Sequence, residues 1–468
     1  MISKQKILRW KQGDKETIMT DKPTTNEERI ARANKPADDA LKMHPYYKGK
    51  IEIVPKCIIR DLQDFAIWYT PGVAEPCKEI HANPEKVYDY TNKGNTVGIV
   101  TDGTRVLGLG DIGPLAGLPV MEGKALIFKY LGGVDAFPIC LDTKDPDELI
   151  RTVKLIAPSF GGINLEDIEN PKCFYILDRL RAEAPIPVWH DDQQGTAAVT
   201  VAGLINALKI VGKKMEDATI TLIGIGAANV CIAKMLFKAG VDPKKMIVVD
   251  SKGILNKKRD DIGPSHKEKR EFCEITNAGN RDGDMEEAMR GQDVVIALSK
   301  SGPGVIDKSW ISRMADNAIV FVCSNPVPEI WPWEAKEAGA RIVATGRSDF
   351  PNQVNNSVGF PAIFRGTLDV MARVITDEMC IAAAVELARC AEDKGIHEDY
   401  LLPTMDEWEI FPREAVAVAK TAIQQGVARL NFTEKELFAM AESKIRRARD
   451  EVALMMDKGI IAPYKEEA

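Results

Sequence analysis

The chain has 468 residues, of which 45% are hydrophobic and 28% charged, and its formal net charge is −7. Its length allows roughly two to four domains, while its charge argues against nucleic-acid binding, and no apolar run reaches the roughly 18 residues of a membrane span. The nine cysteines show no CxxC spacing. They predict free thiols in a reducing compartment, so we expect a cytoplasmic protein that binds neither nucleic acid nor a membrane.

The N-terminal part of the chain changes character near residue 40. Residues 1–40 are polar and highly charged, which predicts an extended or partly helical arm. Beyond the arm, Ile51–Ile53 has the pattern of a strand and Leu62–Trp68 that of a short helix. The turn Tyr69–Val73 follows, and its proline and glycine can hold the Tyr69 phenol in a fixed direction. A tyrosine that only covers the edge of a core is the more common reason for such a pattern.

Strands and helices alternate in the next part of the chain. The expected strands are Thr96–Val100, Val106–Gly110 and Phe137–Leu141, and the expected helices are Gly123–Leu131 and Asp145–Ala157. This alternation predicts a parallel sheet with loops at the strand ends. Lys124 lies near the start of the first helix, where a lysine usually extends along the surface towards solvent.

Two acidic pairs, Glu166-Asp167 and Asp191-Asp192, follow in the sequence. Adjacent carboxylates repel each other, and beside apolar residues they need a compensating cation. A lone acidic pair is usually a solvated loop or a helix N-cap. The second pair, however, follows an apolar stretch typical of a buried strand, and ligands bind at strand ends in open α/β folds. We therefore expect a site for Mg²⁺ or Mn²⁺, hard ions that carboxylate oxygens suit.

A glycine-rich turn between a strand and a helix predicts a dinucleotide site. The strand Thr219–Ile223 leads into the turn, and an amphipathic helix follows it. The glycines allow a tight turn and let the backbone approach a pyrophosphate at the helix N-terminus. The expected cofactor-binding residues of the turn are Gly224, Gly226, Ala227, Ala228 and Asn229. Asn229 stands where a smaller residue is usual, which leaves the approach angle of the helix open.

The end of the second strand bears on the choice between NAD and NADP. Asp250 closes this strand and can accept hydrogen bonds from the ribose hydroxyls of NAD. Ser251 and Lys252 follow at once, and a lysine there can neutralise the 2′-phosphate of NADP. Asp250 would repel that phosphate unless it pointed away. These residues favour NADP slightly and leave NAD open.

The whole pattern predicts an α/β protein with an N-terminal α/β catalytic domain, a doubly wound Rossmann-type domain and C-terminal helices. A buried helix, Thr196–Val211, precedes five short strands separated by helical segments. These strands are Thr219–Ile223, Met246–Asp250, Asp293–Leu298, Ala318–Cys323 and Arg341–Thr345. The expected boundaries are 1–40 for the arm, 41–195 for the catalytic and metal-binding domain, 196–370 for the Rossmann domain and 371–468 for the helical segment.

With these motifs assembled, the sequence resembles the malic enzyme family, in the compact form of bacteria and some lower eukaryotes. The resemblance covers about residues 45–430. It depends on long motifs in the family's order: YTPGVAEPC, IVTDGTRVLGLGDIGPLAGLPVMEGK, GGINLEDI, VWHDDQQGTA, IGIGAAN, CSNPVPEI and QVNNSVGFPAIFRG. It implies oxidative decarboxylation of L-malate to pyruvate and CO₂, with Mg²⁺ or Mn²⁺ and with NADP (or NAD). It also implies a homodimer that uses its N-terminal region.

By motif position, the resemblance also implies roles for single residues. The implied metal ligands are Glu166, Asp167 and Asp192, with Asp191 as their neighbour. The implied catalytic residues are Tyr69 and Lys124. The residues implied near malate and the nicotinamide are Arg105, Asn325 and Asn356. Gln194 stands where many compact members have histidine.

The charges of these residues agree with such roles. Malate is a dianion, and three ligand carboxylates with one divalent ion leave the pocket negative, so Arg105 and Lys124 are needed to attract it. We assign the removal of the C2 hydroxyl proton to Lys124 and the final protonation of C3 to Tyr69. For Lys124 to be neutral near pH 7, its pKa must fall by about 3 units from about 10.4. Burial beside the divalent ion would supply that fall.

Two other functions stay open on the sequence alone. A malolactic enzyme, which keeps its cofactor bound and releases lactate, would share nearly all these motifs, so only its product separates it. A non-catalytic nucleotide-binding homologue would keep the fold without turnover. The presence of Tyr69, Lys124 and the acidic residues counts against this second alternative.

Overall fold

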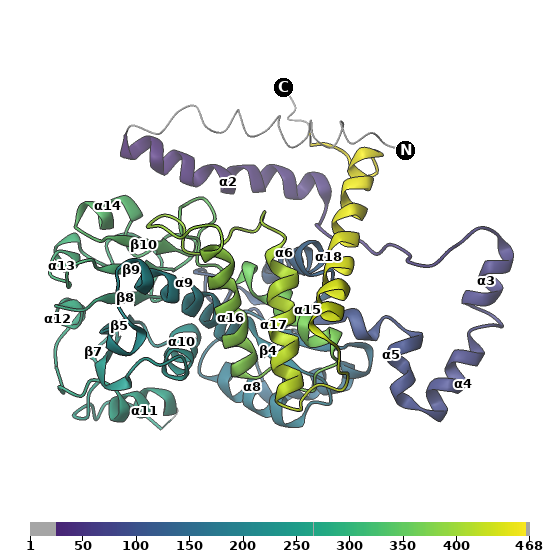
Figure 1. Cartoon of the computed structure of the whole chain (residues 1–468), viewed down its shortest axis with the longest axis horizontal. Coiled ribbons are helices and arrows are strands. Elements are labelled where there is room, and N and C mark those ends of the chain that lie inside the picture. The colour runs from purple at the N-terminus through teal and green to yellow at the C-terminus, as the bar shows by residue number, and fades with distance from the viewer. Residues whose placement is uncertain (1–24, 265, 465–468) are drawn as a thin grey trace. The chain divides into compact units, whose positions relative to one another are not determined.

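The computed structural model describes residues 25–264 and 266–464 of the chain (Figure 1). These residues fall into two units, a large one formed by residues 51–462 and a small one formed by the residues before and after it. In the small unit, helix α2 (Asn26–Tyr47) is capped by Thr25, whose side chain accepts a hydrogen bond from the Glu28 N–H. The expected arm is therefore helical from residue 26, and its first 24 residues lie outside the described part.

The first sheet of the large unit is parallel, with strand order β2-β1-β3-β4. Its strands are β1 (Thr96–Thr101), β2 (Asp135–Cys140), β3 (Gly162–Leu165) and β4 (Val188–His190). The helices that cover its two faces are α7 (Pro146–Ile156) and α8 (Lys172–Glu183) on one side and α6 (Gly113–Gly132) on the other. The central strand β1 is buried along its whole length, which explains its largely apolar sequence.

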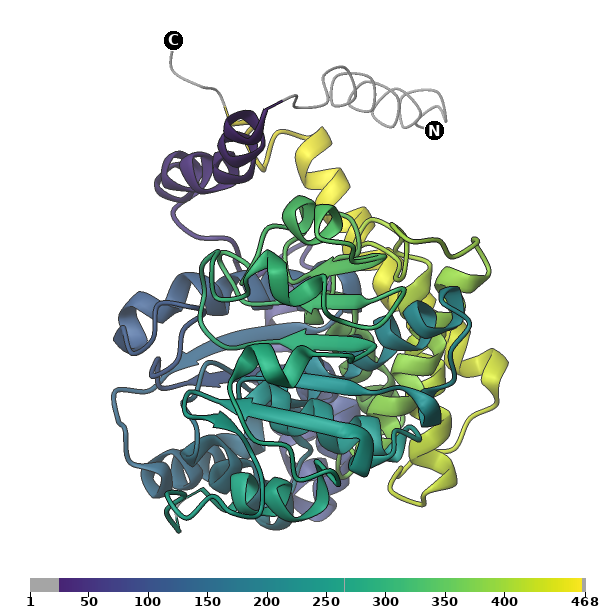
Figure 2. The same ribbon diagram turned by 90° about the vertical axis from the view of Figure 1, so that its left-hand side faces the viewer.

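The second sheet has strand order β10-β9-β8-β5-β6-β7, and Figure 2 shows its teal and green strands side by side. Its parallel strands are β5 (Ile220–Ile223), β6 (Met246–Asp250), β8 (Val294–Ala297), β9 (Ile319–Val322) and β10 (Ile342–Thr345). The short strand β7 (Gly253–Ile254) is antiparallel and closes one edge. The chain leaves β5 towards β6 and later returns to the other side of β5 with β8. Such a reversal of strand order is where open α/β sheets bind ligands.

Helices cover both faces of the second sheet. The helices on one face are α9 (Thr196–Ile210), α10 (Ala227–Lys238) and α11 (Lys267–Ile275). Those on the other face are α12 (Met285–Met289), α13 (Lys308–Ile311) and α14 (Pro332–Glu337). Helix α9 is buried on nearly all sides, as its apolar sequence predicts. The expected α/β fold, with parallel sheets and a Rossmann-type half, is confirmed.

Four C-terminal helices join the core of the first sheet. They are α15 (Phe360–Asp369), α16 (Asp377–Glu392), α17 (Ile410–Gln424) and α18 (Glu434–Asp457). The Phe128 ring of α6 lies 4.6 Å from Phe360 and 5.2 Å from Phe364, measured between ring centroids. A Cβ on Gly133 would lie 2.7 Å from the Lys444 carbonyl oxygen, so the end of α6 packs directly against α18. The last helix, α18, therefore covers α6, which comes from the N-terminal half of the sequence.

Three expectations about local structure are wrong. Ile51–Ile53 forms no strand, because it pairs with no other strand, and Ile53 is 81% exposed. Val106–Gly110 is a tight loop with one isolated bridge, in which Leu107 has a φ of 48°. The helix that carries Lys124 begins ten residues earlier than expected, at Gly113, because a proline in the first turn of a helix is well tolerated. The five strands expected in the second half are present, each one or two residues shorter than or equal to the expected range.

The segment from residue 51 to residue 82, which we call the apolar arm, buries very little. Its helices are α3 (Leu62–Trp68) and α4 (Ala74–Ala82), of which α3 buries only Asp64 and α4 buries no residue. Its exposed large apolar side chains include Ile53, Val54, Ile58, Leu62, Phe65, Ile67, Trp68 and Tyr69. Figure 1 shows α3 and α4 at the edge of the large unit, away from both sheets, and α5 (Val87–Tyr90) follows them towards β1. In the described ranges, no helix combines the length and apolar character that a membrane span requires.

Candidate active site

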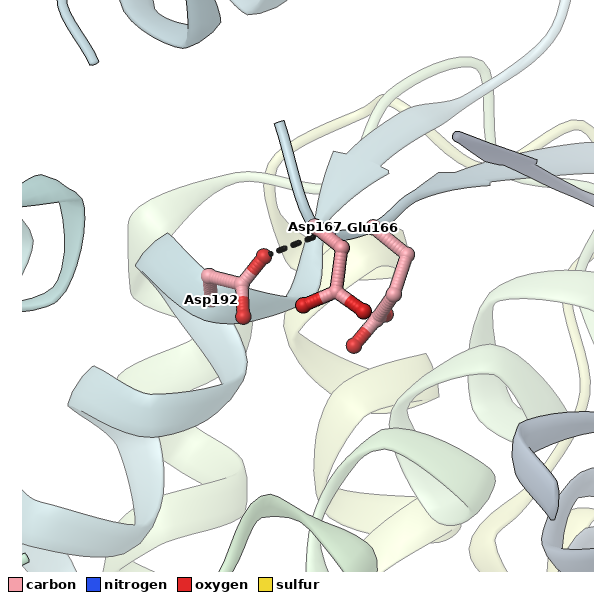
Figure 3. Close-up of side chains that lie close together, drawn as sticks. All are labelled: Glu166, Asp167 and Asp192. Atoms are coloured by element: carbon pink, nitrogen blue, oxygen red, sulfur yellow. Dashed lines mark hydrogen bonds between the residues drawn. The ribbon is translucent and has the colours of Figure 1, made fainter. Parts of the chain in front are cut away.

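The two acidic pairs meet because β3 and β4 are neighbouring parallel strands. Leu165, the last residue of β3, pairs with His190, the last residue of β4, so both pairs emerge at the same edge of the sheet. Carboxylate oxygens of Glu166, Asp167 and Asp192 all lie within 4.8 Å of one another (Figure 3). The Asp167 N–H donates to Asp192 Oδ2 at 2.8 Å.

Local backbone geometry orients the side chains of the two acidic pairs. Asp167 has a φ of 54°, a left-handed conformation that turns the chain sharply after β3. After β4 the five residues Asp191–Gly195 form a π-helical turn, η4, which leads directly into α9. A Cβ at Gly195 would collide with Asp191 Oδ1, so glycine is required for this close approach.

Lys124 brings the one buried cation of this cluster from α6. Its side chain is 8% exposed, and its ammonium forms ion pairs with Asp191 Oδ2 and, at 3.0 Å, with Glu166 Oε1. The ammonium also lies 4.3 Å from the centre of the Phe360 ring. The more common arrangement, in which a lysine extends to solvent, does not occur here.

Burial sets the protonation of the cluster. It raises the pKa of Glu166 and Asp192, and with the nearby Asp192 charge it raises the pKa of Asp167 to about 8. Burial by itself would lower the pKa of Lys124. The charges of Asp191 and Glu166 outweigh it, and the pKa of Lys124 lies above its usual range.

The cluster fits a hard divalent cation. One ammonium faces four carboxylates, so positive charge is lacking. Asp167 Oδ2 is buried and accepts no hydrogen bond from any described residue. A buried oxygen without a donor is expensive in free energy and is a ready ligand for a cation. Glu166, Asp167 and Asp192 are the residues placed to hold such an ion.

The glycine-rich turn has the geometry of an anion site. Gly224 has a φ of 94°, and a Cβ there would lie 2.6 Å from the Leu298 carbonyl oxygen. Helix α10 begins at Ala227, so its free N–H groups face the turn. The Asn229 side chain donates to the carbonyl oxygens of Ile223 and Gly224, both at 2.9 Å. Asn229 therefore holds the start of α10 against the end of β5. Its side chain is larger than is usual at this position, but it does not prevent the helix and the strand from packing closely.

The turn and the carboxylate cluster lie close together. A Cβ on Gly226 would lie 4.0 Å from the Nδ2 of Asn170, in the loop after β3. A Cβ on Gly108, in the loop after β1, would collide with the Asn325 carbonyl oxygen after β9. The carboxyl ends of the two sheets therefore face each other. A dinucleotide on the turn would extend towards the carboxylates.

The three residues expected near the substrate lie around this point. Arg105 is exposed, its N–H donates to the Asp167 carbonyl oxygen at 3.0 Å, and its charge lowers the pKa of Asp192, against the larger effect of burial. Asn325 lies in the loop that follows β9, three residues after the last residue of the strand. Asn356 lies in the short helix η7 (Asn356–Val358) just before Phe360, and its side chain has no hydrogen bond to the described residues.

Among the residues expected to act on or bind the substrate, Tyr69 is the one that a single chain does not bring to this point. Its side chain lies at the C-terminal end of α3 and is 73% exposed. Figure 1 shows α3 far from β4, which carries the second acidic pair. The phenol oxygen makes no hydrogen bond with a described residue.

Comparison with known families decides what kind of protein carries this site. Residues 48–181 match the family model "Malic enzyme, N-terminal domain", and residues 193–423 match "Malic enzyme, NAD binding domain". The chain belongs to the malic enzyme family. It is therefore an oxidoreductase, and the malic-enzyme resemblance of its motifs is confirmed.

Relatives within the malic enzyme family cover most of the chain. A protein named bifunctional malic/malolactic enzyme, from Bacillus subtilis, is 48% identical over 86% of this chain and 96% of its own length. An NAD-dependent malic enzyme from Geobacillus stearothermophilus is 49% identical over 81% of this chain and 78% of its own length. The crystal structure of the malic enzyme from Entamoeba histolytica shares 50% identity and a TM-score of 0.92, over 95% of this chain and 93% of that one.

This member of the malic enzyme family has site residues that the sequence motifs did not single out. His190 is fully buried, its Nδ1 lies 3.6 Å from Asp192 Oδ2, and burial lowers its pKa to about 4. Asn164 donates to Glu166 Oε2 at 2.9 Å and so orients that carboxylate. The adjacency of His190 to the acidic pair was a usable signal, and so was the position of Asn164 on the strand. Nothing in the sequence links Phe360 to Lys124.

Proposed function

We propose that this chain catalyses the oxidative decarboxylation of L-malate to pyruvate and CO₂, with reduction of NADP or NAD and with dependence on Mg²⁺ or Mn²⁺. The observation that carries the proposal is the burial of Lys124 against Asp191 and Glu166, beside Asp167 and Asp192, next to a glycine-rich dinucleotide turn. A buried lysine in an acidic cluster is arranged for proton transfer more than for stability.

Substrate binding follows from the charges around the cluster. Malate carries two carboxylates, and Arg105 offers an exposed guanidinium suited to bind one of them in a bidentate manner. Asn325 and Asn356 add amide groups that can hydrogen-bond the substrate. Together these side chains would orient C2 and C3 of malate between the two sheets.

The proposed cofactors would occupy two neighbouring parts of this arrangement. Glu166, Asp167 and Asp192 would hold the divalent ion, and the turn from Gly224 to Asn229 would hold the pyrophosphate. When bound, the ion supplies Lewis acidity at the C2 oxygen and carboxylate of malate, and the nicotinamide supplies the hydride acceptor.

Lys124 and Tyr69 would move the protons. Lys124 Nζ takes the proton of the C2 hydroxyl, and Tyr69 Oη donates a proton to C3 of enolpyruvate. In the ion-free protein Asp191 and Glu166 keep the Lys124 ammonium protonated. Lys124 thus becomes a base only when those negative charges are compensated, which a divalent ion on the carboxylates would do.

A second copy of the chain would complete the site. Tyr69 lies on the apolar arm, away from the carboxylates of its own chain, and its apolar neighbours include Leu62, Phe65 and Trp68, each more than half exposed. A patch of this kind on a monomer marks an interaction surface. We propose that the chain is a homodimer in which the arm packs on the partner and brings Tyr69 to the partner's Lys124.

The direct test is an assay of the purified chain with L-malate and Mn²⁺. We expect reduced dinucleotide and pyruvate in equal amounts, and no turnover after addition of EDTA. Turnover that persists in EDTA would contradict the metal dependence, and absence of turnover with either dinucleotide would contradict the function.

A malolactic activity is the second candidate, because a relative that is 48% identical is named a bifunctional malic/malolactic enzyme. The same site can retain the reduced cofactor and return its hydride to the product. Quantifying lactate against pyruvate separates the two, since lactate without release of reduced dinucleotide would identify the malolactic reaction.

We also propose that the protein works in the cytoplasm. All nine cysteines are free, and five of them are buried. Free cysteines are typical of proteins in a reducing compartment. Fractionation of cells that produce the tagged chain would test this proposal.

A further inference from the structure

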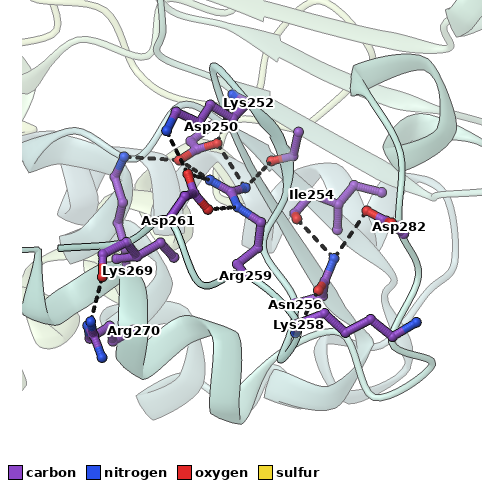
Figure 4. A network of polar contacts seen from close by, with 12 residues as sticks. Asp250, Lys252, Ile254, Asn256, Lys258, Arg259, Asp261, Lys269, Arg270 and Asp282 are labelled. Atoms are coloured by element: carbon purple, nitrogen blue, oxygen red, sulfur yellow. Dashed lines mark hydrogen bonds and ion pairs between the residues drawn. The ribbon is translucent and has the colours of Figure 1, made fainter.

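The carboxylate of Asp250, at the end of β6, is fully occupied by donors of its own chain (Figure 4). Its Oδ1 accepts from the Lys252 N–H at 2.9 Å and from Arg259 Nη1 at 3.2 Å. Its Oδ2 accepts from Arg259 Nη2 at 3.1 Å and from Lys269 Nζ at 3.0 Å. A carboxylate offers about four acceptor positions. None is left for a ribose hydroxyl, and the side chain is only 6% exposed.

The donors come from three different segments of the chain. We call the two carboxylates and the three cationic side chains around them the Asp250 cluster: Asp250, Lys252, Arg259, Asp261 and Lys269. Lys252 follows β6, Arg259 follows β7, and Lys269 lies on α11. Arg259 also binds Asp261 through Nε at 2.5 Å and Nη2 at 3.0 Å, and Lys252 Nζ lies 2.8 Å from Asp261 Oδ2. Two carboxylates therefore face three cationic side chains, which leaves one positive charge in excess.

The Asp250 cluster lies where the adenosine half of a dinucleotide binds in this fold. The Gly224 N–H donates to the Val249 carbonyl oxygen at 2.9 Å, so the glycine-rich turn lies against the end of β6. In nucleotide-binding folds of this type the adenosine ribose lies over the end of the second strand. Lys252 is 64% exposed at this point, so its ammonium can exchange its ion pair with Asp261 for a contact with a ligand.

We propose that Arg259 determines the cofactor preference of this chain, with Lys252 and Lys269, in favour of a 2′-phosphorylated dinucleotide. Arg259 and Lys269 compensate the Asp250 charge, so Asp250 neither repels a phosphate nor accepts from the ribose hydroxyls. The five N–H groups of the Arg259 guanidinium are donated to Asp250, Asp261 and the Gly253 carbonyl oxygen, so Arg259 acts by occupying Asp250. The excess cation that can bind the phosphate oxygens is the exposed Lys252 ammonium. This inference rests on the proposed function for the presence of a dinucleotide, and it concerns the adenosine end only.

The test is a titration calorimetry experiment on the whole chain with two nucleotides that differ only in the 2′-phosphate. Adenosine 2′,5′-bisphosphate should bind at least about tenfold more tightly than adenosine 5′-monophosphate, a difference that should shrink as salt is raised. Equal affinity, or tighter binding of the monophosphate, would overturn the proposal. The Arg259→Ala variant frees Asp250, so the preference should fall at least about fivefold while the monophosphate binds no more weakly.

Two further variants keep the proposal testable if the Arg259→Ala variant does not fold. Lys252→Ala changes an exposed side chain and should lower the preference about threefold or more. Lys257→Ala removes a cation on the same loop whose ammonium lies 3.7 Å from Glu274 instead, and it should leave the preference unchanged within about twofold. A preference unchanged in both Arg259→Ala and Lys252→Ala would contradict the inference. Nucleotide preference without malate turnover would contradict the proposed function alone, and turnover without the preference would contradict this inference alone.

Discussion

The ammonium of Lys124 and the carboxylate of Asp191 form an ion pair in which the side chains are only 8% and 0% exposed. Asp191 is not placed among the three carboxylates that can share a cation, so it holds the lysine beside them rather than competing for the ion. Removing one partner of such a buried pair strongly destabilises the folded protein, because the remaining charge is buried without compensation. The pair therefore ties the position of the proposed base to the fold of the site.

Replacing Lys124 should abolish most of the proton transfer. We expect the kcat of Lys124→Met to fall about 10²- to 10⁴-fold, because the C2 hydroxyl loses its base. The pH dependence of kcat on its acidic side should disappear as well. Lys154→Met, which changes a partly exposed lysine on α7, serves as the control and should keep both properties. A pH profile that survives in Lys124→Met would reject the assignment.

Mixed dimers test whether Tyr69 acts across subunits. Tyr69→Phe and Lys124→Ala should each be nearly inactive as pure proteins. After dissociation and reassociation of an equal mixture, about half of the dimers are mixed, and in each of them one site has both native residues. About a quarter of wild-type activity should therefore return. If Tyr69 acted within its own chain, no mixture would recover activity.

A charge on the apolar arm should prevent association. Trp68 and Phe65 are 51% and 52% exposed in the single chain, and a glutamate at either place would have to be buried without a partner on docking. We expect Trp68→Glu to sediment as a monomer and to lose turnover, because Tyr69 no longer reaches a site. Leu155→Glu alters an apolar residue on α7 that is 68% exposed and lies outside the arm, and it should change neither property.

Metal binding should release protons. The pKa of Asp167 is raised to about 8, so at neutral pH much of this carboxyl is protonated in the ion-free protein. The folded-state pKa of Asp167 lies above the unfolded value of about 3.9, so the folded protein binds this proton more tightly than the unfolded chain does. The stability that comes from this proton is lost as the pH rises towards 8. Mn²⁺ should therefore bind more tightly, and raise Tm more, at pH 8 than at pH 6.

Calorimetry in buffers of different ionisation enthalpy measures this release. We expect proton release on Mn²⁺ binding at pH 7 to fall in Asp167→Asn, which keeps the shape of the side chain and removes its titration. Asp178→Asn, on α8 and outside the cluster, is the matched control. Equal proton release in wild type and Asp167→Asn would show that another group supplies the proton.

Local patterns were enough to predict most of the strands and the turns that carry the glycines and the acidic pairs. Buried parallel strands such as β5 and β6 are short apolar runs, and the requirement for glycine at Gly224 is local, so both can be read from the sequence. The acidic pairs were predictable for the same reason, because each directly follows a strand. Where the pattern was weak, at Ile51–Ile53, the strand was wrong, since a strand forms only when it has a neighbour to pair with.

Other features depend on contacts between distant parts of the chain, and no local pattern carries them. Lys124 and Asp191 are 67 residues apart, and only the packing of α6 against the first sheet buries the lysine. The occupation of Asp250 requires Arg259 and Lys269, which β7 and α11 bring to it. By itself the sequence determined which residue types follow which strands. The tertiary structure alone decided which of them meet, because burial and ion pairing depend on distance in space and not on distance along the chain.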